Sequence, residues 1–164
     1  MLGCDTSKTT ILLGEIRSGL SPEDARRTVS ASEDKWKVIE NSHLPPGDKR
    51  PRFDILQVEV PEFTDCGVKG VLALHFFNGR LTSTWFYPSD LSMYLQCLES
   101  RHIHFDPKGP MTQTERNLGA TIAEVRVSHR TRVWLFRDYR NHDYVGWEDI
   151  KLIAEENQWI RNYL

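Results

Sequence analysis

The chain has 164 residues, of which 39% are hydrophobic and 27% are charged, and its formal net charge is -2. This composition indicates a folded chain rather than a disordered one, and the length suits a single domain over residues 1–164, with 1–10 as a flexible tether. The slightly negative charge provides no general attraction to phosphate backbones, so we expect no nucleic-acid partner. No apolar run reaches the roughly 18 residues that a transmembrane segment needs.

The first elements are marked by capping residues and prolines. Ser21 is expected to cap a short helix with Pro22 at its first helical position, where the missing amide proton costs nothing. A strand is predicted to begin at residues 36–39, and a second one spans residues 53–60, with Pro61 ending it. The stretch between these strands contains three prolines and a glycine, which predicts a loop.

A hairpin with an Asn78-Gly79 turn is the strongest local signal in the chain. A type I′ turn needs positive φ at both central residues, and Asn and Gly tolerate this conformation best. The flanking strands, residues 71–77 and 80–87, are rich in aromatic and β-branched residues. Because the second strand carries large rings on both faces, we expect this hairpin to be central in its sheet.

The second half of the chain contains two more helices and a second group of strands. Ser89 is expected to cap a helix whose apolar residues recur at helical spacing, and residues 101–120 follow as a long irregular connection. Three further strands are predicted at residues 121–127, 132–136 and 144–147, before a terminal helix. Consecutive groups of strands favour an α+β fold, an antiparallel sheet with helices packed mainly on one face.

The segment LLGEIRSGLSPEDARRTV, followed later by a long hairpin, resembles a unit found in two known families. Its helix start contains Gly19, Ser21 and Glu23, and the order of elements is similar to that of the outer-membrane assembly lipoproteins and the β-lactamase-inhibitor proteins. The resemblance covers about half of the chain. It implies a small helix-plus-sheet unit.

Three widely spaced cysteines, Cys4, Cys66 and Cys97, form no disulfide framework and no CxxC metal motif, so we expect free thiols or small buried side chains. The stretch Leu2-Gly3-Cys4-Asp5 resembles the processing site of bacterial lipoproteins, which implies a lipid on Cys4. As written, the chain is expected in the cytoplasm. A preceding apolar leader would instead make it periplasmic and anchored to the membrane through Cys4.

The sequence His102-Ile-His104-Phe-Asp106 is a candidate metal site. In an extended segment these three polar side chains project to one side, where two imidazoles and a carboxylate can share a zinc ion. The alternative is that both histidines are surface residues near the end of a helix, where a cationic imidazole is favoured.

Arginine and aromatic residues alternate in the second group of strands. Arg126, Arg132, Trp134, Arg137 and Tyr139 have the composition of protein-binding hot spots, and the acidic residues among them dilute any field for phosphate. A polar outer sheet face with Trp134 in the core is the other interpretation. The chain has neither a Gly-x-Ser-x-Gly elbow nor a phosphate-binding glycine loop, and we expect no cofactor.

The sequence therefore favours a non-enzymatic domain that binds another protein, of the inhibitor or toxin-neutralising immunity kind. The expected partner is a toxin or an enzyme. Two alternatives remain open, which are a metal-dependent enzyme that uses His102, His104 and Asp106, and a periplasmic lipoprotein scaffold.

Overall fold

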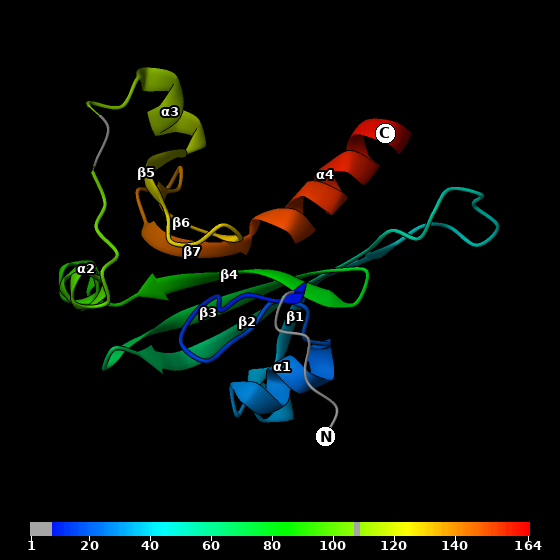
Figure 1. Cartoon of the computed structure of the whole chain (residues 1–164), viewed down its shortest axis with the longest axis horizontal. Coiled ribbons are helices and arrows are strands. Elements are labelled where there is room, and N and C mark those ends of the chain that lie inside the picture. The colour runs from blue at the N-terminus through cyan, green and yellow to red at the C-terminus, as the bar shows by residue number, and fades with distance from the viewer. Residues whose placement is uncertain (1–7, 107–108) are drawn as a thin grey trace.

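The structure, a computed structural model, describes residues 8–106 and 109–164, so Cys4 and most of the expected tether lie outside the described residues. Seven antiparallel strands form one open sheet in the order β1-β2-β3-β4-β7-β6-β5 (Figure 1). The strands are β1 (Lys37–His43), β2 (Asp54–Asp65), β3 (Val68–Phe77), β4 (Arg80–Pro88), β5 (Ala120–Arg126), β6 (Thr131–Arg137) and β7 (Asp143–Asp149). The α+β class and the antiparallel sheet are confirmed, and β4 occupies the middle position.

Two antiparallel meanders make up this sheet. The first contains β1 to β4, the second contains β5 to β7, and the two meet where residues 83–86 of β4 pair with residues 145–148 of β7. The helical elements are α1 (Pro22–Thr28), η2 (Glu33–Lys35), α2 (Leu91–Ser100), α3 (Gln113–Leu118) and α4 (Ile150–Tyr163). We refer to the pairing of β4 with β7 as the seam.

The Asn78-Gly79 turn has the predicted conformation. Both residues have positive φ, 50° and 77° respectively, as a type I′ turn requires. The Asn78 amide also holds the start of β2, because its Oδ1 accepts from the backbone N of Asp54 at 2.9 Å and its Nδ2 donates to the carbonyl of Arg52 at 3.1 Å. The turn residue therefore fixes both the hairpin and its neighbour.

The sheet buries different side chains on its two faces. Leu72, Leu74 and Phe76 of β3 point into the main core, together with Tyr94 and Leu98 of α2. The intervening residues of β3 lie on the opposite face, where Phe77 packs in a smaller cluster with Trp159 of α4. Accordingly, α1 and α4 lie on opposite sides of the sheet in Figure 1.

Several elements differ from the predictions, and three of the differences have a clear local cause. Strand β2 continues past Pro61 because the pairing with β3 shifts between Val60 and Phe63, so the proline sits in an irregularity that needs no ladder bond from it. Helix α2 is capped by Asp90 rather than Ser89, since the Asp90 side chain accepts from the backbone N of Met93. The long connection contains α3, which begins with a capping box.

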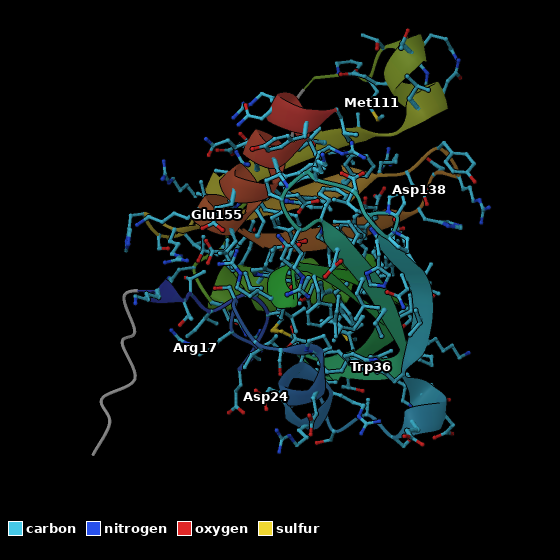
Figure 2. The ribbon with its side chains drawn as sticks, turned by 90° about the vertical axis from the view of Figure 1, so that its right-hand side faces the viewer. Arg17, Asp24, Trp36, Met111, Asp138 and Glu155 are labelled. Atoms are coloured by element: carbon cyan, nitrogen blue, oxygen red, sulfur yellow. A yellow bond between two sulfur atoms is a disulfide. The ribbon has the colours of Figure 1, made fainter. Side chains whose placement is uncertain are left out.

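The prediction of free thiols is wrong for two of the three cysteines. Cys66, in the turn between β2 and β3, forms a disulfide with Cys97 of α2, and their Cα atoms are 6.1 Å apart. The two cysteines are 31 residues apart in the sequence, so nothing local indicates that they pair. Only the folded chain brings α2 back over this turn. Figure 2 shows the arrangement of the side chains around the two faces of the sheet.

Candidate functional site

The structure separates the five residues predicted to bind a protein. Side chains alternate along a strand, and the pairing of Arg126 with Arg132 and of Glu124 with Trp134 places Arg126, Arg132 and Trp134 on the same face. Arg137 falls on the other face, in line with the buried Val133 and Leu135. Tyr139 lies outside the strands, in the turn between β6 and β7, with 62% of its surface exposed.

Trp134 belongs to a continuous group of half-buried rings on its face. We call this group the aromatic face, and it consists of Trp85 and Tyr87 from β4, Trp134 and Phe136 from β6, and Tyr144 from β7. Tyr144 is at its centre, with ring centroids at 4.5 Å from Tyr87, 5.1 Å from Phe136 and 5.5 Å from Trp134. Trp85 lies 6.5 Å from Trp134 across the seam.

A glycine in β7 allows Trp134 to lie flat against the sheet. A Cβ atom at Gly146 would come within 2.3 Å of the indole Cζ2 of Trp134, closer than any two carbon atoms approach without a bond. Gly146 pairs with Trp134 on one side and with Trp85 on the other. The two indoles therefore share the space above a single position that has no side chain.

Charged groups of both signs surround the rings. Arg132 forms an ion pair with Glu148 of β7. Arg126 donates to the carbonyls of Ser128 and His129 at 3.2 and 2.9 Å, so it holds the β5–β6 turn without neutralising its own charge. A hollow of about 310 Å³ is lined by Glu124, Arg132 and Glu148 together with the rings of Trp134, Phe136 and Tyr144.

Helix α4 borders the aromatic face on the side of β3. His75 stacks on Trp85 with ring centroids 6.1 Å apart, and its Nε2 lies 3.0 Å from a carboxylate oxygen of Glu156. The indole nitrogen of Trp85 is buried and has no hydrogen-bond partner among the described residues. Burial raises the pKa of the Tyr144 and Tyr87 phenols, so both stay neutral.

The candidate metal ligands lie beyond the end of α2. His104 is between two carboxylates, with Nδ1 at 2.9 Å from Glu99 and Nε2 at 3.4 Å from Asp106. The hydrogen bond with Glu99 raises the pKa of His104, which favours its cationic form. His102 precedes it in a positive-φ conformation. No group of three or more His, Cys, Asp or Glu side chains in residues 8–106 and 109–164 is arranged to hold a metal ion.

Comparisons with known proteins do not assign this chain to a class. No protein family, curated protein or solved structure matches it. The resemblance to the assembly lipoproteins and inhibitor proteins therefore remains an expectation. Within the part of the chain that is described, no helix is both long enough and apolar enough to cross a membrane.

The sequence identifies Trp134 and Arg132 but not the other four rings of the aromatic face. Trp85, Tyr87, Phe136 and Tyr144 all lie in predicted strands. What the sequence did not reveal is that β4 pairs with β7, the contact that places these rings beside Trp134. The site is therefore a product of the strand order.

Proposed function

We propose that this chain is a non-enzymatic domain of the inhibitor or immunity kind that binds another protein through the aromatic face. The observation that carries the proposal is the set of five half-buried rings, four of which contact the fifth, Tyr144, on a sheet face that α4 covers only at one border. Tryptophan, tyrosine and arginine are the residues that contribute most to protein-protein binding energy. Rings held by a sheet lose little conformational freedom when a partner binds.

The charges around the rings favour a protein over a nucleic acid. Arg132 and Glu148 neutralise each other, while Glu124 stands opposite Trp134 in the neighbouring strand. A phosphate backbone would meet repulsion from the carboxylates, whereas a protein surface can complement both signs. The partner we propose presents an apolar side chain to the 310 Å³ hollow and an acidic residue to Arg126.

The disulfide supports a location outside the reducing cytosol. Structural disulfides persist in oxidising compartments, which include the periplasm and the extracellular space. Cys66–Cys97 therefore favours the periplasmic alternative over the cytoplasmic one. A periplasmic scaffold anchored through Cys4 would present the same aromatic face to its partner.

Two arginines of β6 provide a matched test. Arg132 and Arg137 are on the same strand, each has 39% of its side chain exposed, and each pairs with a carboxylate of β7, Glu148 and Asp143 respectively. They differ in the face on which they lie. Arg132→Glu should abolish binding, whereas Arg137→Glu should retain it.

The experiment compares affinity capture from host extract by the immobilised wild-type chain, Arg132→Glu, Trp134→Ala and Arg137→Glu, with quantitative mass spectrometry of the retained proteins. We expect one protein in stoichiometric amount on the wild type and Arg137→Glu, and its loss from the other two. Circular dichroism verifies that each variant is folded. Equal retention by all four chains, or no retained protein on the wild type, contradicts the proposal.

A further inference from the structure

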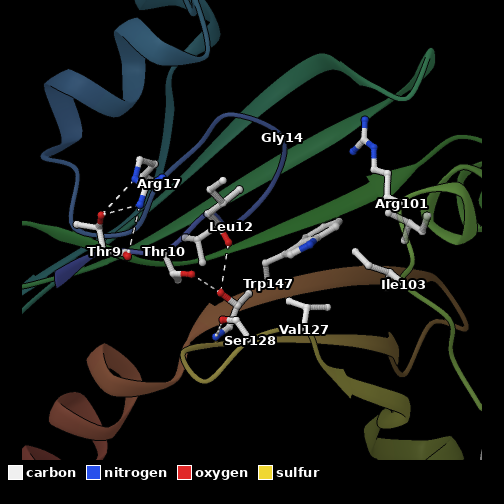
Figure 3. A pocket seen from close by; sticks show the side chains of 13 residues that line it. Thr9, Thr10, Leu12, Gly14, Arg17, Arg101, Ile103, Val127, Ser128 and Trp147 are labelled. Carbon is white, nitrogen blue, oxygen red and sulfur yellow. Dashed lines mark hydrogen bonds between the residues drawn. The ribbon is translucent and has the colours of Figure 1, made fainter. Parts of the chain in front are cut away.

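A cavity of about 630 Å³ opens on the face of the sheet opposite the aromatic face. The segment of residues 9–17 forms one wall, the residues that follow α2 form a second, and the β5–β6 turn forms a third (Figure 3). Its volume is in the range of small-molecule sites, about 300–1,000 Å³. Because it shares no lining residue with the aromatic face, its function is independent of the function proposed above.

The interior of this cavity is apolar and already formed. Trp147, with 3% of its surface exposed, and Leu98 belong to the main core, so their positions are fixed by packing. Ile103 and Val127 continue the apolar surface toward the opening. Val127 has 43% of its surface exposed, although it is an aliphatic residue beside an apolar floor. A ligand with an apolar body would cover it.

The polar residues that line the cavity are either positively charged or uncharged. Arg17 and Arg101 contribute the charged groups, accompanied by threonine and serine hydroxyls, and no described carboxylate lines the cavity. In Figure 3, Arg17 and Arg101 lie on opposite sides of Trp147. An anion entering the cavity therefore meets guanidinium groups and hydroxyls without a competing negative charge on the wall.

The two arginines differ in their partners. Arg101 donates to both oxygens of Asp65, at 3.2 and 3.3 Å, and Asp65 also accepts from the buried hydroxyl of Tyr94. Arg17 donates to Thr9 instead, with Nε and Nη2 each 3.1 Å from the hydroxyl oxygen. Within residues 8–106 and 109–164, Arg17 forms no ion pair with a carboxylate. One positive charge in the cavity is therefore available to a ligand.

We propose that this cavity binds a small amphipathic monocarboxylic acid. The carboxylate accepts hydrogen bonds from the guanidinium of Arg17, and the apolar body lies on Trp147 between Ile103 and Val127. A single carboxylate fits because Arg101 is already neutralised by Asp65. Guanidinium groups bind carboxylates by charge-assisted hydrogen bonds in a planar geometry, which explains the use of arginine at this position.

The test is a titration of the full chain with octanoate, followed by two-dimensional amide and side-chain NMR. Octanol and octylamine serve as probes with the same apolar body and a neutral or positive head. We expect octanoate to shift the Arg17 Nε, Trp147 indole and Val127 signals, and to bind at least about tenfold more tightly than either control probe. Equal binding of octanoate and octanol, or shifts confined to other parts of the chain, overturns the proposal.

Two pairs of variants separate the head and body contacts. Arg17→Gln should weaken octanoate binding about tenfold, whereas Arg27→Gln, an exposed arginine of α1, should not change it. Val127→Asp should prevent binding by placing a negative charge at the opening, and Val38→Asp, on the exposed strand β1, is its control. If Arg17→Gln does not fold, the comparison of Val127→Asp with Val38→Asp still tests the proposed site. Unchanged affinity in Arg17→Gln or in Val127→Asp contradicts the proposed site.

Discussion

Removing the Cys66–Cys97 disulfide should destabilise the chain by about 4 kcal/mol without changing its fold. The bond closes a loop of 31 residues that contains β3, β4 and the first two turns of α2. In the chain-entropy account, a cross-link over this separation removes about 12 cal/mol/K of entropy from the unfolded state, or about 4 kcal/mol at 25 °C. This loss is a large fraction of the stability of a typical domain, about 5–15 kcal/mol.

The folded state should survive without the bond because a second contact joins the same two elements. The buried hydroxyl of Tyr94 in α2 donates to Asp65 at the end of β2 at 2.7 Å, next to the disulfide in both segments. The reduced protein therefore retains the position of α2. Its loss of stability should come from the greater freedom of the unfolded chain, which predicts a lower urea midpoint with native circular dichroism.

The assay is urea unfolding of the wild type and of the Cys66→Ser/Cys97→Ser variant, each with and without dithiothreitol. Reductant should lower the stability of the wild type to that of the variant and leave the variant unchanged. Alkylation and peptide mapping of the unreduced wild type should recover Cys66 and Cys97 in one linked pair. Free alkylated Cys66 and Cys97, or a variant as stable as the oxidised wild type, would refute this reasoning.

Three further predictions concern single contacts. Tyr94→Phe removes the hydrogen bond to the Asp65 carboxylate and should lower the free energy of unfolding by about 2 kcal/mol in urea titrations, whereas Tyr163→Phe at the exposed C-terminus should not. Gly146→Ala forces the Trp134 indole off the sheet and should cost about 1–3 kcal/mol with an altered near-ultraviolet circular dichroism spectrum, whereas Gly109→Ala, at an exposed position with open space, should leave that spectrum unchanged. Hydrogen bonds from Arg50 lower the pKa of Asp48 from 3.8 to about 2, so their stabilisation is complete above pH 4 and is lost as the pH falls through about 2. Carboxyl-carbon NMR should show this titration, and Arg50→Gln should return the Asp48 pKa toward its ordinary value.

The elements that could be predicted from the sequence are those whose signals are local. The Ser21 hydroxyl caps α1 by accepting a hydrogen bond from the backbone N–H three residues later, and Asn78-Gly79 forms its turn from its own conformational preferences. Pro61 does not end its strand, because the local rule that proline ends a strand fails where the pairing is irregular.

The candidate site could be predicted only in part because its contacts join distant segments. The sequence marks Trp134 and Arg132 as a recognition pair, yet nothing near Trp85 indicates that β7 will pair with β4. The faces of Arg132 and Arg137 follow from alternation along β6, but which face would remain uncovered depends on where α4 packs. The disulfide and the cavity depend on the return of α2 over the β2–β3 turn.

The seam between the two meanders links recognition to the completion of folding. Each meander can form from hairpins between neighbouring strands, whereas the seam joins segments that are far apart in the chain, and such contacts form slowly. Trp85 belongs to the first meander and Trp134 to the second, so neither half contains the aromatic face by itself. If the aromatic face binds a partner as proposed, a newly made chain has no binding surface until its two halves have joined, and a partner that requires both tryptophans can bind only completely folded molecules.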